Sequence, residues 1–567
     1  MATLVSALDI MNNVQYGENN HKEYKWSNIQ QEKILQLSFQ LLRTENVNKR
    51  TEIAVRFRDS FEKGTLEEKK ILIKLLAHTR DVEEGKGEYA ISFSILKQLM
   101  QVNKELCTEI IKAFVGVEEN TIESTTTSTT TSTTIGKKSL GSWKDMKYLF
   151  NELKYCPDEL IKITNAQLKK DHINMSNMKP CSLLAKWIPR ETSKKFGWIH
   201  EKLAKDYFTH YGRSGWTSSA IKKAQTHYRQ LVSSINKHLG TVQINQCDHT
   251  WRNINFNRVT SITMMKQKNA FLNSKNIDSE DRQKCKENLL EYMQNVKKGL
   301  YEMKGKQTSM VDFVKSAIFN KDTNERDIIN EMWKNNSKNT KSLEKMIAMV
   351  DTSGSMETDN AIPLYSAIGL GIRVAEKSKL GKRVMTFNSN PTWINIDENN
   401  CKDFVDQVQT IQQAGWGANT NFHKALDVIL EQIVKNKLKA EDVEDLVLVV
   451  FSDMQFDSAM SRKHDNDDIN NNTVRRILED KFYEAGVAVC GKGYKVPHIL
   501  FWNLRSTTGF PELSYQPNVT MMSGYNPNLL NSFVENGING LHDITPWTML
   551  VKMLDNPRYN HLEKYVE

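Results

Sequence analysis

A short stretch with hard-oxygen side chains follows an apolar run near the middle of the chain. It is MIAMVDTSGSMET, which begins at Met346 and contains Asp351, Ser353 and Ser355. One carboxylate and two hydroxyls at this spacing are compatible with three kinds of site: an aspartic-protease corner, a phosphate loop or a cation site. The choice among them decides whether an enzyme is expected.

Both enzyme interpretations require residues that the sequence lacks. An aspartic protease needs two Asp-Thr/Ser-Gly corners, because two carboxylates must share one proton. No second copy is present, and the stretch that starts at Asp457 has alanine where the glycine would be. A phosphate loop needs Gly-x-x-x-x-Gly-Lys-Ser/Thr, which is also absent.

The position of these residues favours the cation site. Asp351 lies at the carboxyl end of an apolar strand predicted over 345–350, which is where open α/β sheets form ligand sites. Two further oxygen donors are expected from other element ends, Thr420 in GWGANTNF and Asp453 in FSDMQFD. The full set suits Mg²⁺ or another divalent cation: Asp351, Ser353, Ser355, Thr420 and Asp453. In the alternative, the serines cap a helix and Asp351 closes a turn.

Strands and helices alternate after residue 343. We predict strands over 345–350, 383–387, 446–452, 496–502 and 519–522. We predict helices over 362–375, 404–411, 422–434, 472–485 and 527–535. Because several of these strands are apolar throughout, the pattern predicts a doubly wound, mostly parallel α/β domain over 343–567.

Residues 1–342 have the apolar periodicity of helices instead. This pattern predicts an all-α array of helical repeats, with helices over 34–42, 90–100, 143–153, 198–208, 220–239 and 283–302. A further helix is predicted where the apolar stripe at 71–76 follows Thr65 and Glu68, which have the spacing of a capping box. The tract STTTSTTTSTT at 124–134 has no apolar residue to bury, so we predict a disordered insertion there. The Asn- and Lys-rich stretch 322–342 is predicted to be a linker between the two domains.

Charge divides the chain at the same place. The net charge is +9, but residues 343–567 hold 22 Lys+Arg against 29 Asp+Glu, and residues 1–342 hold 55 against 39. A basic half favours a polyanionic partner such as nucleic acid, and a solvated lysine-rich surface is the alternative. The densest cationic stretch gives the candidate RNA-binding residues: Lys186, Arg190, Lys194, Lys195, Lys202, Arg213, Lys222, Lys223 and Arg229.

Tryptophans alternate with these cations. Trp187, Trp198 and Trp216 would allow unpaired bases to stack beside the phosphate contacts. For Trp187 and Trp198, we favour the alternative that they anchor the hydrophobic core.

Other features of the sequence point to a soluble protein of the cytoplasm. The seven cysteines are irregularly spaced without a Cys-x-x-Cys pair, which favours a reducing compartment without disulfides or a thiolate zinc site. The first residues lack the pattern of a secretory signal, and the longest apolar run is too short to span a bilayer. We find no nucleophile–base set, zinc cluster or nucleotide loop, so we expect no enzymatic activity.

The three oxygen-bearing stretches resemble the metal-ion-dependent adhesion site of von Willebrand factor A domains. All five positions match, from Asp351 to Asp453. The resemblance implies that these residues bind Mg²⁺ or another divalent cation, directly or through water. It also implies that an open coordination position takes an acidic group from a partner protein.

Motifs along nearly the whole chain resemble a poorly characterised family of eukaryotes and giant viruses, catalogued as a domain of unknown function. They are HTRDVEEGKGE at 78–88, GSWKD at 141–145, SLLAKW at 182–187, FSDMQFD at 451–457 and PHILFWNL at 497–504. A viral source would make the virion a further location. The architecture of this family is similar to that of the Ro autoantigen, in which a ring-like helical-repeat (TROVE) module is joined to a von Willebrand A domain.

The similarity to Ro implies binding of a small structured RNA by the helical half. It is an analogy of architecture, because most of the helical sequence departs from Ro and no individual RNA contact carries over. We therefore expect a non-enzymatic ribonucleoprotein scaffold with Mg²⁺-dependent protein docking. The alternative is an adaptor that binds proteins without RNA.

Overall fold

The computed structural model describes most of the chain. The described residues are 13–19, 21–117, 138–320, 322–397, 401–415, 417, 420–457, 474–537 and 543–566. The predicted Ser/Thr insertion at 124–134 lies outside them. No helix among these residues combines the length and apolar composition needed to cross a membrane.

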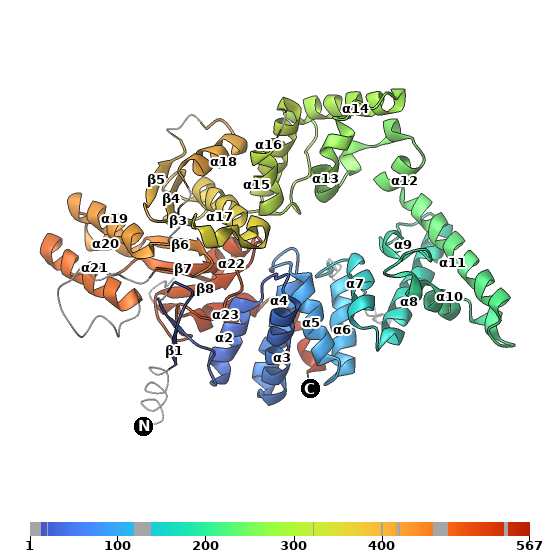
Figure 1. Ribbon diagram of the computed structural model, residues 1–567, viewed down its shortest axis with the longest axis horizontal. Helices are drawn as coiled ribbons and strands as arrows, with labels where there is room; N and C mark the ends of the chain where they lie inside the picture. Colours follow the sequence, from blue (N-terminus) through green and yellow to red (C-terminus); the bar gives the residue numbers. More distant parts are fainter. Residues whose placement is uncertain are drawn as a thin grey trace, which may run out of the picture.

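A six-stranded sheet forms the centre of the second half (Figure 1). Its strands are β3 (Met346–Asp351), β4 (Arg383–Phe387), β5 (Thr392–Asn395), β6 (Val447–Ser452), β7 (His498–Asn503) and β8 (Val519–Ser523). Their order is β5-β4-β3-β6-β7-β8, and every pair is parallel except β4–β5. Strands β3, β6, β7 and β8 are buried at every position, which explains their mainly apolar sequences. The mostly parallel sheet is therefore as predicted, with β5 as an unpredicted antiparallel edge.

Helices flank this sheet. They are α17 (Thr358–Lys377), α18 (Phe404–Gln413), α19 (Phe422–Lys435), α20 (Ala440–Glu444), α21 (Val474–Cys490), α22 (Leu529–Gly537) and α23 (Pro546–Leu554). The last short helix, α24 (Pro557–Asn560), packs instead on α4 (Leu66–Arg80) of the first half. Helix α17 packs on β3, and α23 packs on β8. The regular part of α17 begins at Ile362, because residues 359–361 have left-handed backbone angles. The predicted helix over 362–375 corresponds to this regular part.

The first half is mainly helical. Its first group is α2 (Gln30–Gln40), α3 (Val47–Lys63), α4 (Leu66–Arg80), α5 (Tyr89–Leu99), α6 (Lys104–Val115) and α7 (Lys144–Glu152). Its second group is α8 (Pro157–Ser176), α9 (Leu184–Trp187), α10 (Gly197–Tyr207), the 3₁₀ turn η1 (Thr209–Gly212) and α11 (Ser218–Leu239). Its third group is α12 (Val242–Cys247), α13 (Ser261–Phe271), α14 (Glu280–Lys297), α15 (Met310–Ile318) and α16 (Thr323–Ser337).

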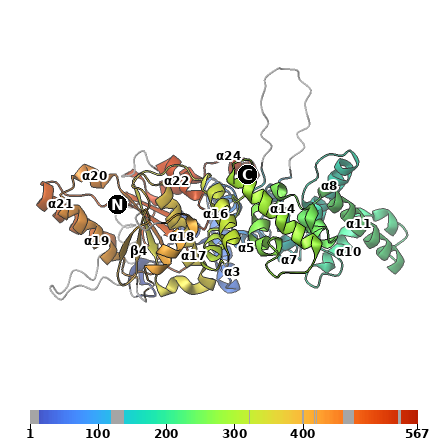
Figure 2. The same cartoon turned by 90° about the horizontal axis from the view of Figure 1, so that it is seen from above.

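These helices follow an arc that leaves the sheet unit and returns to it (Figure 1). At the start of the arc, α2 packs on β8 and α23. At its end, α15 packs on α17 and α18. The second group lies farthest from the sheet, as the view from above also shows (Figure 2). Both ends of the helical array are therefore attached to one α/β unit.

Two local predictions for residues 1–342 are wrong. The stretch predicted as a linker contains helix α16, in which Trp333 is buried and stacks on Phe404 of α18 with ring centroids 3.8 Å apart. The stretch was predicted as a linker from its Asn- and Lys-rich composition, although it also contains an apolar stripe at helical spacing. The half is also not all-α, because β1 (Val14–Tyr16) and β2 (Lys22–Tyr24) form an antiparallel hairpin.

The hairpin escaped prediction for a physical reason. Its strands are three residues long, too short to show a clear alternation. Its second strand depends on a distant partner, since Tyr24 forms an antiparallel bridge with Phe510. Their backbones exchange hydrogen bonds of 2.9 and 3.1 Å.

The HTRDVEEGKGE motif is a junction between the helical array and the α/β unit. Arg80 forms a buried ion pair of 2.6 Å with Asp145 of the GSWKD motif, so the two motifs contact each other. Lys86 is buried and donates to the carbonyl of Ser38 in α2 and, at 2.7 Å, to the hydroxyl of Ser523 in β8. Burial lowers the pKa of Lys86 to about 7. These charged residues thus hold segments of the fold together.

Candidate functional site

The candidate metal site lies where the strand order of the sheet changes direction. From β3 the chain proceeds outward through β4 and β5, and then crosses to β6 on the other side of β3. The carboxyl ends of β3 and β6 therefore flank the point at which doubly wound sheets bind ligands. Asp351 is the last residue of β3, and Asp453 directly follows β6.

Asp351 is fully buried and held at both carboxylate oxygens. Its Oδ1 accepts a hydrogen bond of 2.9 Å from the backbone N–H of Ser353. Its Oδ2 accepts one of 2.6 Å from the hydroxyl of Ser452, the last residue of β6. Burial, and after it the negative charge of Asp453, raises the pKa of Asp351 to about 7.

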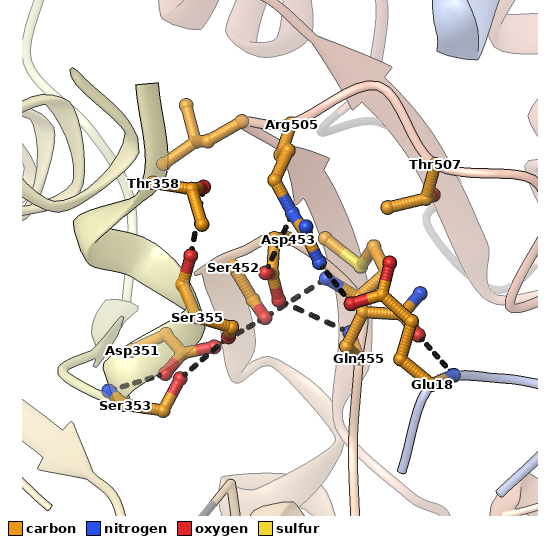
Figure 3. Close-up of polar contacts among 12 residues, drawn as sticks. Glu18, Asp351, Ser353, Ser355, Thr358, Ser452, Asp453, Gln455, Arg505 and Thr507 are labelled. Atoms are coloured by element: carbon orange, nitrogen blue, oxygen red, sulfur yellow. Dashed lines mark hydrogen bonds and ion pairs between the residues drawn. The ribbon is translucent and has the colours of Figure 1, made fainter. Parts of the chain in front are cut away.

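The hydroxyls of the first loop face each other. Oγ of Ser353 and Oγ of Ser355 are 3.1 Å apart. The Ser355 carbonyl accepts a hydrogen bond from the Thr358 hydroxyl at 2.9 Å, which fixes the short 3₁₀ turn after the strand. The two serines and Asp351 thus form one compact oxygen-rich loop (Figure 3).

The loop that contains Thr420 lies against the other two. Ser353 forms a parallel bridge with Gly417. Thr420 is buried, and its carbonyl accepts a hydrogen bond of 2.9 Å from the N–H of Asp457 in the loop after β6. The structure therefore brings together all three stretches that the sequence analysis singled out.

Asp453 is fully buried and differs from Asp351 in its partners. Its Oδ1 accepts a hydrogen bond of 3.2 Å from the N–H of Gln455. Its Oδ2 lies 2.9 Å from Nε of Arg505, yet the N–H is not directed at it, and among the described residues Oδ2 has no hydrogen-bond donor. Arg505 also pairs with Glu18 of the N-terminal hairpin at 2.7 Å (Figure 3).

The donor set fits a hard divalent cation. It offers two buried carboxylates and adjacent hydroxyls, and one carboxylate oxygen is without a hydrogen-bond donor among the described residues. Oxygen ligands of this kind suit Mg²⁺ rather than a soft metal. In the part of the chain that the structure describes, no group of three or more His, Cys, Asp or Glu side chains is arranged to hold a metal. Cation binding at Asp351 therefore depends on the hydroxyls as well as the carboxylates and stays a prediction.

The predicted RNA-binding cations are spread along the second helical group. Eight of them are exposed: Arg190, Lys194, Lys195, Lys202, Arg213, Lys222, Lys223 and Arg229. Lys186 in α9 is half-buried, and Arg229 is paired with Glu191. The exposed cations lie on α10, on α11 and in the connections before each of these helices, so they are spread over several elements rather than gathered in a convergent site.

Aromatic rings underlie several of these cations. The ammonium of Lys202 lies 5.7 Å from the ring centre of Trp198, and that of Lys223 lies 4.8 Å from that of Tyr211. Trp187 and Trp198 are partly buried against the core, as the favoured alternative predicts, whereas Trp216 is 37% exposed. The ammonium groups of these two lysines therefore lie over aromatic faces, in the geometry of cation–π contacts.

Sequence reasoning missed Arg505 and Glu18 beside the candidate metal site. Arg505 follows β7 by two residues, so the rule that ligands gather at the carboxyl ends of parallel strands would have indicated it. No sequence signal indicated Glu18, because the hairpin reaches the site from the other end of the chain.

Comparisons with known proteins give families without an assigned function. Residues 345–553 match the domain of unknown function DUF7788, and residues 158–356 match the domain of unknown function DUF2828. The chain is 26% identical over 530 residues to uncharacterized protein L728 of Acanthamoeba polyphaga mimivirus, covering 88% of this chain and 81% of that protein. The crystal structure of the Deinococcus radiodurans RO (RSR) protein is similar over 89% of this chain and 99% of that one, with 10% identity and a TM-score of 0.32.

Proposed function

We propose that this protein is a non-enzymatic binding scaffold of the von Willebrand A type, with a divalent-cation site that docks an acidic group of a protein partner. The observation that carries the proposal is the convergence of Asp351, Ser353, Ser355 and Asp453 at the strand-order switch point. When bound, Mg²⁺ supplies a positive charge and an open coordination position for a carboxylate. Thr420 completes the proposed ligand set.

The residues around the site have distinct tasks in this proposal. Ser452 and the N–H of Ser353 orient the Asp351 carboxylate through hydrogen bonds of 2.6 and 2.9 Å. The 3.1 Å contact between the Ser353 and Ser355 hydroxyls keeps two neutral oxygen ligands side by side. Such second contacts around the ligands set the affinity and selectivity of a metal site.

The docking proposal is tested with a defined acidic probe. A Glu-containing peptide library would be incubated with the immobilised full chain in Mg²⁺ and in EDTA. We expect the wild type to retain acidic peptides in Mg²⁺ but not in EDTA, and Asp351→Ala to retain none in either condition. Equal retention by the wild type and Asp351→Ala would overturn docking through this site.

We also propose that the second helical group binds RNA. Its support is the set of eight exposed cations on and around α10 and α11, within a half of the chain that is strongly basic. Because the ammonium groups of Lys202 and Lys223 already lie over the Trp198 and Tyr211 rings, we assign the surface to phosphate contacts rather than to base stacking.

A salt series with a pool of small structured RNAs tests this part. Phosphate contacts release counterions, so the affinity should fall steeply as salt rises. The full chain would be titrated into labelled RNA at several salt concentrations. An absence of RNA binding at low salt would overturn this part of the proposal. The protein would then be an adaptor that binds proteins without RNA, through the Mg²⁺-dependent docking.

A further inference from the structure

One guanidinium links the candidate metal site to the N-terminal hairpin. Nε of Arg505 lies 2.9 Å from Oδ2 of Asp453, and Nη2 donates a hydrogen bond of 2.7 Å to Oε2 of Glu18. Figure 3 shows Arg505 between the two carboxylates. The Asp453 side chain is fully buried, while that of Glu18 is 60% exposed. Arg505 thus shares its charge between a proposed metal ligand and a surface acid.

The turn of the hairpin is anchored to the same loop that carries Asp453. The N–H of Glu18 donates to Oε1 of Gln455 at 2.7 Å, and the Asn19 amide donates to the Gln455 carbonyl at 2.8 Å. The N–H of Gln455 in turn donates to Oδ1 of Asp453. The position of Glu18 is therefore fixed by backbone and side-chain contacts beside the site.

The position of Arg505 has a direct electrostatic consequence for cation binding. A positive charge within 3 Å of a ligand carboxylate competes with an incoming cation and repels it. Glu18 opposes this effect, because its negative charge partly neutralises the Arg505 guanidinium and lies near the site.

We propose that Arg505 sets the divalent-cation affinity of the Asp351 site and that Glu18 tunes this affinity by sharing the Arg505 guanidinium. The inference rests on the proposed function, since it concerns the same cation. By linkage, the coupling is reciprocal: if docked Glu18 favours the cation, the cation favours docking of the hairpin. The hairpin is then held more tightly against the Asp453 loop when the cation is bound.

Calorimetric titration of the full chain with Mg²⁺ tests the two roles, which have opposite signs. Arg505→Gln should bind Mg²⁺ roughly tenfold more tightly than the wild type, and Glu18→Gln several-fold more weakly, within the usual range of site coupling. Lys495→Gln and Glu444→Gln are matched charge controls. Lys495 and Glu444 pair with each other before β7 and β6, at the amino ends of the strands, and should leave the affinity unchanged.

A double variant distinguishes an effect of Glu18 through Arg505 from a direct electrostatic effect of Glu18 on the cation. If Glu18 acts through Arg505, Glu18→Gln should change the affinity much less in the Arg505→Gln background than in the wild type. If Arg505→Gln folds poorly, Arg505→Lys is the second variant. It keeps the positive charge, so its Mg²⁺ affinity should stay close to that of the wild type. Equal effects of Glu18→Gln in both backgrounds would overturn the shared role of Arg505.

Hydrogen exchange supplies a readout that does not depend on affinity. Mg²⁺ should slow amide exchange in the hairpin, residues 13–24, in the wild type but not in Glu18→Gln. Unchanged affinity in Arg505→Gln, with binding still lost in Asp351→Ala, would overturn this inference and leave the proposed function standing. Binding of Mg²⁺ by Arg505→Gln but not by the wild type would support Arg505 as the competing cation and contradict the proposed Mg²⁺-dependent function.

Discussion

Asp81 and Arg558 lie 477 residues apart in the sequence and form a paired contact in the fold. The guanidinium donates hydrogen bonds of 2.7 and 2.8 Å to the two carboxylate oxygens, and the Tyr559 hydroxyl donates a third at 3.0 Å. Asp81 directly follows α4, whereas Arg558 and Tyr559 belong to α24. The last short helix is thereby attached to the start of the helical array.

Removal of Arg558 should therefore destabilise the whole protein. Arg558→Ala leaves the buried Asp81 carboxylate without its cation, held only by the Tyr559 hydroxyl and the backbone N–H of Glu83. It should lower the free energy of unfolding by about 3–5 kcal/mol. Arg558→Lys should recover part of this loss, since it keeps the charge but not the two parallel bonds. Urea unfolding followed by circular dichroism measures both changes. A loss below about 1 kcal/mol in Arg558→Ala would show that the pair contributes little.

The ion pair between Arg80 and Asp145 predicts strong non-additivity. Both side chains are 5% exposed, so either single change leaves an uncompensated buried charge. Arg80→Met and Asp145→Leu should each destabilise the fold, and the double variant should be less destabilised than the sum of the two. Urea unfolding of the four proteins gives the coupling energy. Additive effects would mean that the two family motifs are not coupled energetically.

His78 predicts a pH dependence of stability. It is buried beside Tyr559, and burial, followed by the charge of Lys86, lowers its pKa to about 3. An unfolded histidine titrates near pH 6.5, so between about pH 6.5 and 3 the unfolded chain binds a proton that the folded chain excludes. The contribution of His78 to stability is therefore lost as the pH falls through this window.

The substitution His78→Gln isolates this contribution. It should reduce the slope of unfolding free energy against pH below pH 6.5, where one such group contributes at most about 1.4 kcal/mol per pH unit. His423, which burial also shifts to a lower pKa of about 4, keeps part of the slope and serves as the internal comparison. Identical slopes in the wild type and His78→Gln would contradict the assignment.

The basic surface predicts a change in the salt dependence of RNA binding. Replacing Arg213, Lys222 and Lys223 by Gln should weaken binding and reduce the slope of log affinity against log salt by roughly 2 to 3, for three phosphate contacts. The matched control replaces three exposed lysines, Lys435 at the end of α19 and Lys437 and Lys439 in the connection that follows it. An equal loss in both triple variants would indicate only an effect of net charge.

The sequence was informative where one element decides its own structure. The strand ending at Asp351 is apolar throughout because it is buried on both faces, and Thr65 and Glu68 form the capping box that starts α4. Two loops of the candidate metal site, those of Asp351 and Asp453, followed from the rule that carboxyl ends of parallel strands share one edge. The Thr420 loop follows helix α18 and not a strand, and it was indicated by the resemblance to the adhesion site. These features depend on local pattern and on a general property of the sheet.

Features that depend on distant partners could not be predicted in this way. The hairpin around Glu18 pairs with Phe510, and α16 is ordered by stacking of Trp333 on Phe404. In both cases the local composition is polar, and the stabilising contact comes from a segment far along the chain. The guanidinium of Arg505 belongs to the same class, since its two partners come from opposite parts of the sequence.

Calorimetric titration of Mg²⁺ into the full-length wild type and Asp351→Ala is the most direct test of the central claim. The proposed site predicts one saturable binding event in the wild type and none in Asp351→Ala, whose folding is checked by thermal unfolding. Indistinguishable titrations of the two folded proteins would contradict a cation site at the carboxyl ends of β3 and β6.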